Sequence, residues 1–359
     1  MELENNFNLE RFNPEVLREY DIRGIVNKDL TVNTAYSIGR TFGHIVCSKF
    51  SEKKIATGYD GRLTSPSLHD ALCAGLLESG ANVFSIGLCP TPMAYFAHYH
   101  LITDAAVMVT GSHNPPEYNG FKMVLNKHSF FADEIQNLQS LTTLKNISTG
   151  QGKLNNIDIR NEYVKNNLKN IKFNKKMKIA WDIANGSMGT VIDSFTNQLS
   201  SAEHIVINKE VDGTFPNHHP DPTVPKNMEQ LVKTVVSNSC DIGLGFDGDG
   251  DRLGVVDNKG NIIWADQYML LLAKEISNLY ENPKIIMDVK SSKVFFDEVK
   301  KFNCEPIMFK TGHSPIKEKM KEVKSPLSGE MSGHICYGDD FFGYDDAMYV
   351  GLRLLRILS

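Results

Sequence analysis

Three aspartates alternate with glycines in one short stretch of the sequence, Gly245-Phe-Asp-Gly-Asp-Gly-Asp-Arg252. Glycine permits tight backbone turns at positive φ, so this spacing lets the three carboxylates converge. Converged carboxylates repel one another unless a cation lies among them. Oxygen ligands without histidine or cysteine favour Mg²⁺ or Ca²⁺. Asp247, Asp249 and Asp251 are therefore predicted to be metal ligands.

Two other interpretations of this stretch fail on spacing. An EF-hand loop that begins at Asp247 requires glycine and glutamate where the sequence has Arg252 and Asn258. A G-x-G-x-x-G pattern begins at Gly243 and is typical of a dinucleotide site. Aspartates and an apolar run follow this pattern instead of a helix, and carboxylates repel a pyrophosphate. We therefore do not expect a dinucleotide cofactor.

A second stretch, Thr110-Gly-Ser-His-Asn-Pro115, follows an apolar run that is predicted to be a buried strand. The strand delivers Ser112 into a loop rich in turn-forming residues. A serine beside a histidine suggests a serine hydrolase, but the G-x-S-x-G elbow is absent because Asn114 replaces its second glycine. Adjacent residues also form the nucleophile–base hydrogen bond with difficulty. These residues alone leave open a functional serine and a turn serine that caps its own backbone.

Three smaller polar clusters have residue types suited to binding. Gly329-Glu-Met-Ser-Gly-His334 alternates hydrogen-bond acceptors and donors, as suits the recognition of sugar hydroxyls. Lys310-Thr-Gly-His-Ser314 is a short polar turn whose backbone N–H groups suit a phosphate. Arg18-Glu-Tyr-Asp-Ile-Arg-Gly24 places charges beside a turn. Taken alone, each cluster is more typical of a surface turn or a structural salt-bridge network.

Alternating strand and helix patterns must position these motifs. Lys54–Asp60 is a short apolar run, residues 67–80 have helical spacing that ends at a glycine, and residues 82–87 predict the next strand. This βαβ rhythm favours a mostly parallel sheet. Similar runs that end in aspartate recur at Lys178–Asp182 and Lys284–Asp288, at a domain-sized spacing. The recurrence predicts three related α/β units.

Composition narrows the class of protein. The 359 residues include 38 basic and 43 acidic side chains, for a net charge of -5. This length suggests two or three domains, and the charge provides no basic footprint for nucleic acid and no polybasic patch for a membrane. The acidic N-terminus lacks the features of a signal peptide, and no apolar run is long enough to span a bilayer. Six scattered cysteines are predicted to be buried free thiols in a reducing compartment, so we expect a cytoplasmic protein.

In this order, the five motifs resemble the α-D-phosphohexomutase superfamily, most closely its bacterial phosphomannomutase/phosphoglucomutase branch. The resemblance implies that Ser112 carries a phosphoryl group. It implies further that Ser112 holds Mg²⁺ together with Asp247, Asp249 and Asp251, and that Arg252 adds a fixed positive charge beside the phosphoserine. The implied reaction interconverts hexose 1-phosphate and hexose 6-phosphate. It proceeds through a hexose 1,6-bisphosphate, which also serves as the activator.

The resemblance also assigns proton transfer and substrate contacts. It places Lys122, Arg23 and His334 near the hydroxyl proton. Lys122 would act as general base only as a neutral amine, which positive neighbours favour. Glu330 and Ser332 would contact the sugar hydroxyls in either orientation of the hexose. The other implied substrate contacts are Tyr20, His113, Lys290, Gly312 and His313.

The expected fold is α/β, with three tandem related domains, mixed and mostly parallel sheets, and an active cleft between the domains. The domains are residues 1–152 with the serine loop, 153–257 with the metal loop and 258–359 with the sugar loop. The polar connector Ser148–Gly152 and the turn Asp257–Gly260 mark the boundaries. By resemblance, we also expect the family's fourth domain, which grips the substrate phosphate, to be absent from this sequence.

The substrate and the activity have alternatives. Met331 in the sugar loop, where relatives specific for other sugars carry other residues, favours mannose and glucose phosphates. A phosphosugar-binding relative or fragment without turnover, or a hydrolase that loses its phosphoserine to water, would carry the same motifs. Hexose phosphates are the expected partners, without nucleic acid or membrane, and the sequence leaves open a monomer or a homodimer.

Overall fold

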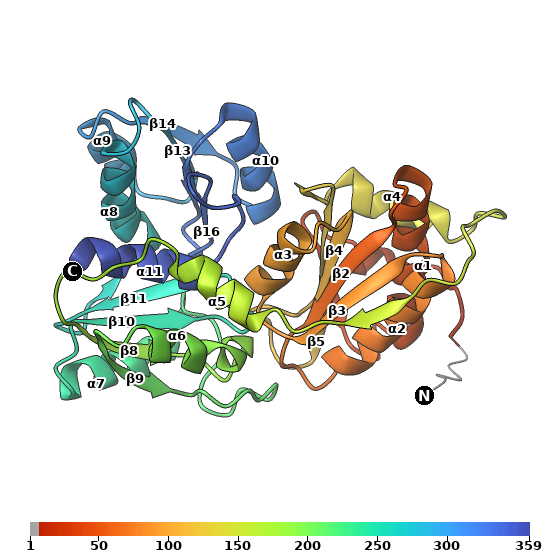
Figure 1. The fold of residues 1–359 in the computed structure, drawn as a ribbon, viewed down its shortest axis with the longest axis horizontal. Helices are drawn as coiled ribbons and strands as arrows, with labels where there is room; N and C mark the ends of the chain where they lie inside the picture. The colour runs from red at the N-terminus through yellow and green to blue at the C-terminus, as the bar shows by residue number, and fades with distance from the viewer. Residues whose placement is uncertain (1–6) are drawn as a thin grey trace. The chain divides into compact units, whose positions relative to one another are not determined.

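The computed structural model describes residues 7–359, which form two compact units. The first unit ends at Ile159, and the second is Arg160–Ser359. The first unit contains one β-sheet and the second contains two, each covered by helices (Figure 1). Among the residues described, no helix is both long and apolar enough to cross a membrane.

The sheet of the first unit has the strand order β1-β5-β4-β2-β3-β7, with β6 paired to β5. Strands β4, β2, β3 and β7 are parallel, whereas β5, β1 and β6 run antiparallel to their neighbours. The strands are β1 (Ile22–Ile25), β2 (Lys54–Tyr59), β3 (Asn82–Leu88), β4 (Ala105–Val109), β5 (Tyr118–Leu125), β6 (His128–Ser129) and β7 (Leu154–Asn156). The helices are η1 (Pro14–Val16), α1 (Val32–Lys49), α2 (Ser65–Glu78), α3 (Thr91–His100) and α4 (Asp133–Leu141). Apolar side chains of α1, α2 and the strands form one buried core.

The second unit begins with a five-stranded sheet of order β12-β11-β10-β8-β9. Its parallel strands are β8 (Lys178–Asp182), β9 (Glu203–Ile207) and β10 (Ile242–Phe246), and its antiparallel strands are β11 (Leu253–Asp257) and β12 (Ile262–Ile263). The helices of this part are α5 (Arg160–Leu168), η2 (Ser187–Thr190), α6 (Ile192–Gln198), η3 (Pro225–Met228) and α7 (Glu229–Ser237).

A four-stranded sheet of order β14-β13-β15-β16 completes the second unit. The strands are β13 (Lys284–Asp288), β14 (Glu305–Phe309), β15 (Leu327–Gly329) and β16 (Ile335–Tyr337), of which β16 alone is antiparallel to its neighbour within this sheet. The helices are α8 (Ala265–Ser277), α9 (Lys293–Lys300), α10 (His313–Val323) and α11 (Ala347–Leu358).

The three sheets share one topology. Each contains the same pattern of four consecutive strands, which begins at β2, β8 or β13: the first of the four lies between the second and the third, and the fourth pairs antiparallel with the third. The resulting orders are β5-β4-β2-β3, β11-β10-β8-β9 and β16-β15-β13-β14. The connection from the third strand to the antiparallel strand carries the serine loop, the metal loop and the sugar loop, respectively. The three motifs therefore occupy equivalent positions in three related folds.

The structure confirms the predicted α/β class, the three related units and the mixed sheets. The helix expected over residues 67–80 is Ser65–Glu78, and Gly80 follows it with φ +92°. The predicted hairpin around Asp257–Gly260 joins β11 to β12. All six cysteines are free, and all but the half-buried Cys47 are buried. Because β7 pairs with β3, the first sheet continues past the connector Ser148–Gly152; the three domain ranges themselves stay predictions.

Candidate active site

Ser112 lies in the connection from β4 to β5 of the first unit. Its side chain is buried, and its backbone has φ +49°, in the left-handed region. The Ser112 N–H donates to Thr110 Oγ1 at 2.8 Å, and the Thr110 N–H donates to the carbonyl of Gly120 at 3.0 Å. The Ser112 hydroxyl lies 3.2 Å from His113 Nδ1. The loop therefore holds one serine in a conformation that few L-residues adopt.

Two predicted basic residues share a face of the first sheet. Arg23 on β1 pairs in register with Gly120 on β5, and Lys122 follows Gly120 two residues on. Alternate residues of a strand point to the same face, so Arg23 and Lys122 are diagonal neighbours. Lys122 is buried, and Arg23 forms an ion pair with Asp21. The first unit thus places two basic side chains on β1 and on β5, and β5 directly follows the serine loop.

The three aspartates of the metal loop are fully buried in the second unit. Asp247 Oδ1 accepts the N–H groups of Gly250, Asp251 and Arg252 at 3.0–3.1 Å, which folds the loop around that carboxylate. Gly250 supports the turn with φ +77°. One oxygen from each carboxylate lies within 4.8 Å of the others. Three converging carboxylates without nitrogen or sulfur donors fit a hard divalent cation such as Mg²⁺.

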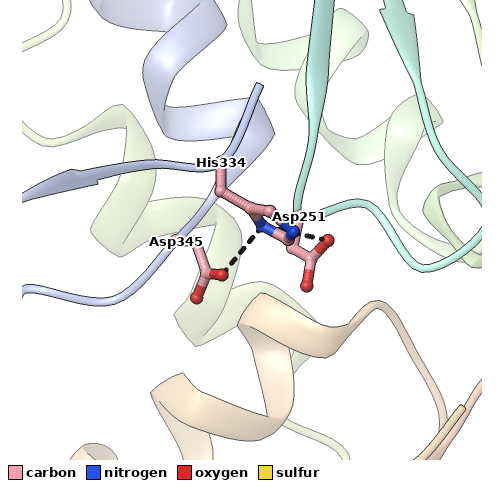
Figure 2. Close-up of side chains that lie close together, drawn as sticks. All are labelled: Asp251, His334 and Asp345. Carbon is pink, nitrogen blue, oxygen red and sulfur yellow. Dashed lines mark ion pairs between the residues drawn. The ribbon is translucent and has the colours of Figure 1, made fainter. Parts of the chain in front are cut away.

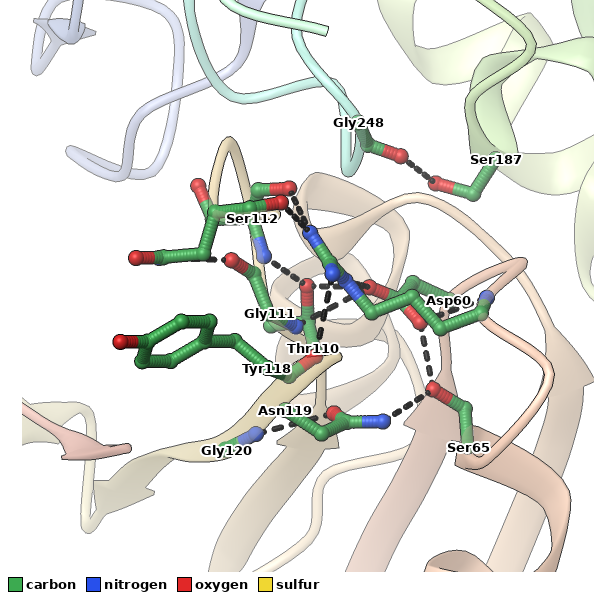
Figure 3. A network of polar contacts seen from close by, with 12 residues as sticks. Asp60, Ser65, Thr110, Gly111, Ser112, Tyr118, Asn119, Gly120, Ser187 and Gly248 are labelled. Atoms are coloured by element: carbon green, nitrogen blue, oxygen red, sulfur yellow. Dashed lines mark hydrogen bonds and ion pairs between the residues drawn. The ribbon is translucent and has the colours of Figure 1, made fainter. Parts of the chain in front are cut away.

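The connection after β8 holds the metal loop through hydrogen bonds and backbone packing at Gly248. The hydroxyl of Ser187 donates to the carbonyl of Gly248 at 3.2 Å (Figure 3). The N–H of Ser187 donates to the same carbonyl at 3.0 Å. A Cβ at Gly186 would lie 2.8 Å from that same carbonyl oxygen, so the two loops pack backbone against backbone. The metal loop is thereby fixed at its centre, between the first and second predicted ligands.

His334 joins the metal loop to the sugar loop. An antiparallel bridge pairs Arg252 with His334, and Arg252 Nε donates to His334 Nε2 at 3.0 Å. Arginine nitrogens only donate, so Nε2 is an acceptor and the proton of the neutral imidazole is on Nδ1. His334 Nδ1 lies 3.0 Å from Asp345 Oδ2 and 3.5 Å from Asp251 Oδ1 (Figure 2). The two carboxylates therefore favour the tautomer that the arginine requires.

Asp345 is the buried anion of this cluster. Lys317 Nζ donates to Asp345 Oδ1 at 2.9 Å, and His313 Nδ1 lies 3.8 Å from Asp345 Oδ2. Burial opposes ionisation, but Lys317, His334 and His313 together hold the pKa of Asp345 well below its usual value. The imidazole rings of His313 and His334 stack with centroids 5.2 Å apart. Asp345 thus orients two predicted site residues at once.

Asp251, His334 and Asp345 also lie close enough to hold a metal ion. The proton on His334 Nδ1 argues against this, because that nitrogen faces both carboxylates. Lys317 already supplies a positive charge to Asp345. The aspartates of the metal loop are therefore the better fit to a cation.

The sugar loop begins with Glu330, which is buried. Glu330 Oε1 accepts the N–H of Gly312 at 2.6 Å, and this contact joins the two loops that follow β14 and β15. Burial raises the pKa of Glu330, against the opposing influence of His334, Gly312 and Arg252. Ser332 Oγ is buried and has no hydrogen-bond partner within residues 7–359. A buried hydroxyl of this kind is a natural contact for a polar ligand.

The structure divides the predicted site residues between the two units. The first unit carries Tyr20, Arg23, Ser112, His113 and Lys122. The second unit brings together Asp247, Asp249, Asp251, Arg252, Gly312, His313, Glu330, Ser332 and His334. Lys290 is exposed in the connection after β13 and makes no contact with this cluster that the structure records. The joint role of the two groups stays a prediction.

Sequence reasoning missed residues that hold these loops. They are Asp60 and Arg62 beside the serine loop, Asp288 beside the sugar loop, and Lys317 and Asp345 beside His334. Asp288 Oδ1 accepts the N–H of Met331 at 3.2 Å, and Asp288 Oδ2 accepts the Thr311 hydroxyl at 3.1 Å. The recurrence of aspartate at the ends of β2, β8 and β13 could have pointed to Asp60 and Asp288. No comparable pattern pointed to Lys317 or Asp345.

Comparisons with known proteins agree over most of the chain. Residues 14–144, 161–260 and 264–359 match the family models for phosphoglucomutase/phosphomannomutase alpha/beta/alpha domains I, II and III, respectively. A phosphomannomutase/phosphoglucomutase of Pseudomonas aeruginosa is 42% identical over 344 residues, which cover 96% of this chain and 74% of that protein. A phosphoglucomutase of Neisseria meningitidis serogroup A is 43% identical over 350 residues, which cover 96% and 75%.

A crystal structure supports the same assignment. The phosphoglucomutase/phosphomannomutase family protein of Burkholderia thailandensis superposes with a TM-score of 0.92 at 39% identity. The match covers 97% of this chain and 77% of that one. The chain thus spans about three quarters of the length of these relatives.

Proposed function

The chain belongs to the phosphoglucomutase/phosphomannomutase family, and on this basis we propose that it interconverts the 1- and 6-phosphates of glucose, mannose or both. The proposed route uses a phosphoserine at Ser112 and a hexose 1,6-bisphosphate, which also primes the enzyme. The relatives named above carry this activity in their names. The observation that supports it most strongly in this chain is the group of three buried, converging carboxylates at Asp247, Asp249 and Asp251.

Those carboxylates would hold Mg²⁺, with Ser112 as a further proposed ligand. When bound, the ion supplies positive charge that stabilises the phosphoryl oxygens during transfer. Arg252 is fixed by its bond to His334 and adds a second positive charge next to the loop. Removing the buried carboxylates would therefore weaken both metal binding and transfer.

The first unit supplies Ser112, whose hydroxyl oxygen would carry the transferred phosphoryl group. A sugar hydroxyl attacks the phosphorus of the phosphoserine, the bond to Ser112 Oγ breaks, and a new bond joins phosphorus to the sugar oxygen. The hydroxyl proton is proposed to pass to Lys122, which is buried and lies diagonally across from Arg23 on the neighbouring strand; this step uses the neutral amine. In the second half of the cycle, Ser112 Oγ attacks the other phosphoryl group of the bisphosphate, the bond from that phosphorus to the sugar oxygen breaks, and Lys122 returns the proton to that sugar oxygen.

The second unit supplies the sugar contacts. Glu330 and the buried hydroxyl of Ser332 would bind the ring hydroxyls, and Gly312 and His313 lie beside them. Tyr20, His113 and Lys290 are proposed as further contacts. Because both ends of the hexose must reach one serine, the contacts must tolerate two orientations of the sugar. Hydrogen bonds to ring hydroxyls permit this better than a phosphate-specific pocket.

A coupled mutase assay on the whole chain tests the proposal. The assay uses glucose 1-phosphate or mannose 1-phosphate with Mg²⁺ and catalytic glucose 1,6-bisphosphate. We expect turnover that Ser112→Ala abolishes, and an Mg²⁺ requirement that Asp249→Asn shifts at least about tenfold. Retained mutase activity in Ser112→Ala would sink the assignment.

Two other outcomes identify the alternatives. Steady release of inorganic phosphate without the isomeric sugar phosphate identifies a hydrolase. Saturable binding of glucose 1-phosphate without turnover identifies a binding protein. Ser112→Ala distinguishes these two outcomes, because it abolishes phosphate release by a phosphoserine hydrolase and leaves simple binding unchanged.

A further inference from the structure

Arg62 is a buried arginine that holds the serine loop by its backbone. It lies in the connection after β2 and is 1% exposed. Its terminal nitrogens donate to four carbonyl groups between residues 112 and 118, at 2.6–3.0 Å. These carbonyls belong to Ser112, Asn114, Pro115 and Tyr118. The guanidinium group of Arg62 therefore holds the serine loop from Ser112 at one end to Tyr118 at the other.

Asp60 completes this arrangement from the end of β2. Asp60 Oδ2 accepts the Thr110 hydroxyl at 2.8 Å and the Gly111 N–H at 3.1 Å, and lies 3.3 Å from Arg62 Nε (Figure 3). Asp60 Oδ1 accepts the N–H of Arg62 and the hydroxyl of Ser65. The carboxylate holds the residues before the serine, and the guanidinium holds those after it. The two opposite charges compensate each other in the interior.

Asp60 and Arg62 pack closely against the serine loop. A Cβ at Gly111 would lie 2.4 Å from Arg62 Nε and 2.8 Å from the carbonyl oxygen of Tyr118. Ser112 itself is in the left-handed region, which an L-residue keeps only when its surroundings enforce it. Arg62 donates to the Ser112 carbonyl at 2.7 Å and so fixes that end of the residue. The Ser112 N–H donates to Thr110 Oγ1, and the Thr110 hydroxyl in turn donates to Asp60.

We propose that Asp60 and Arg62 are a positioning pair that sets the direction of Ser112 Oγ for phosphoryl transfer, an inference that rests on the proposed function. The pair does not touch the reacting atoms. It acts by holding the loop, and in-line transfer is sensitive to misplacement of about 1 Å. Lysine cannot replace Arg62, because one ammonium with three donors does not match the fork that reaches four carbonyls.

Arg62→Lys in the whole chain tests this proposal by kinetics. Phosphoryl transfer from glucose 1,6-bisphosphate to Ser112 is followed in a single turnover, and kcat and KM come from the coupled assay. We expect the transfer rate and kcat to fall about 100-fold while KM for glucose 1-phosphate stays within about 2-fold. At long times, all of the Ser112 in the variant should still become phosphorylated. This end point excludes a loss of folded protein as the cause of the slower transfer.

Arg40→Lys is the matched control. Arg40 is also a buried arginine of the first unit, and it bonds to Glu78 and to the carbonyl of Ser148. It makes no recorded contact with residues 110–120. We expect its substitution to lower thermal stability and to leave the transfer rate within about 2-fold.

Hydrogen exchange provides a readout that does not depend on activity. Backbone amides of residues 110–120 should exchange at least about tenfold faster in Arg62→Lys, and not in Arg40→Lys. Unchanged exchange and unchanged transfer in Arg62→Lys would overturn the proposal. If that variant does not fold, Asp60→Asn, which keeps the side-chain size and loses one acceptor, decides the question by the same two measurements.

The two proposals fail in different ways. If Ser112→Ala keeps mutase activity, the proposed function fails, whatever Arg62→Lys does. If Ser112→Ala is inactive and Arg62→Lys transfers at the normal rate, only the positioning pair is wrong.

Discussion

Replacement of Asp345 by asparagine tests the buried cluster around His334. Asp345 is 0% exposed and is the counter-charge of Lys317, which is 5% exposed. Asp345→Asn keeps the size of the side chain and removes its charge. The Lys317 ammonium would then lie in the interior without the carboxylate that it contacts at 2.9 Å. The substitution therefore isolates the electrostatic part of this contact.

The burial of both groups sets the expected magnitude. Removing one partner of a buried ion pair costs about 3–5 kcal/mol, because the remaining charge has lost its compensation. For a unit of this size, such a loss lowers the Tm by roughly 10 °C. Lys317→Met combined with Asp345→Asn removes both charges, and we expect the double variant to be more stable than additivity predicts by at least about 1.5 kcal/mol.

Urea unfolding followed by tryptophan fluorescence measures these differences in the right part of the molecule. The chain has two tryptophans, Trp181 and Trp264, and both lie in the second unit with Asp345. Asp297→Asn is the matched control in that unit, since it removes an exposed ion pair with Lys293. Its urea midpoint should stay at the wild-type value. Additivity of the two single substitutions within about 0.5 kcal/mol would refute the argument from buried charge.

Three further changes test other parts of the account. Burial raises the pKa of Asp346 to about 7; since this lies above the unfolded value of about 3.9, the contribution of Asp346 to stability should fall by roughly 3 kcal/mol as the pH rises from 4 to 7. Asp346→Asn should therefore be the more stable protein at pH 8 and equal to wild type near pH 4 in urea unfolding, and a difference that stays constant with pH contradicts this. Gly111→Ala would press a Cβ against Arg62. We expect the free energy of unfolding to fall by about 1–3 kcal/mol and turnover in the coupled assay to be impaired. Wild-type values for both measurements would exclude the clash. Ser332→Ala should raise the KM for glucose 1-phosphate roughly 2- to 10-fold with an unchanged Tm, because its buried hydroxyl has no partner in the part of the chain described; an unchanged KM argues against the sugar contact.

Local patterns made much of the fold predictable. Strands that end in Asp60, Asp182 and Asp288 could be read from short apolar runs, because a buried strand and its terminal turn leave a signal within seven residues or so. The metal loop was predictable for the same reason, since its ligands alternate with glycines in a single turn. The equivalence of the three functional loops was not visible, because it depends on the order in which distant strands pair.

Long-range packing explains the residues that the sequence did not reveal. Lys317 and Asp345 are 28 residues apart, and Asp345 belongs to an acidic run that is typical of an exposed loop. Their burial follows only from the packing of α10 and of the segment before α11 around His334. Arg62 has the same character: it follows a strand as an ordinary turn residue, and its partners in the serine loop lie 50 to 56 residues away.

The site of phosphorylation tests the central claim most directly. The whole chain is incubated with glucose 1,6-bisphosphate and Mg²⁺, and intact mass and peptide fragmentation locate any phosphoryl group. The account predicts one phosphoryl group on Ser112, which disappears when glucose 1-phosphate or mannose 1-phosphate is added and is recovered on the sugar. A phosphoryl group on another residue, or mutase turnover with Ser112 unmodified throughout, would contradict it.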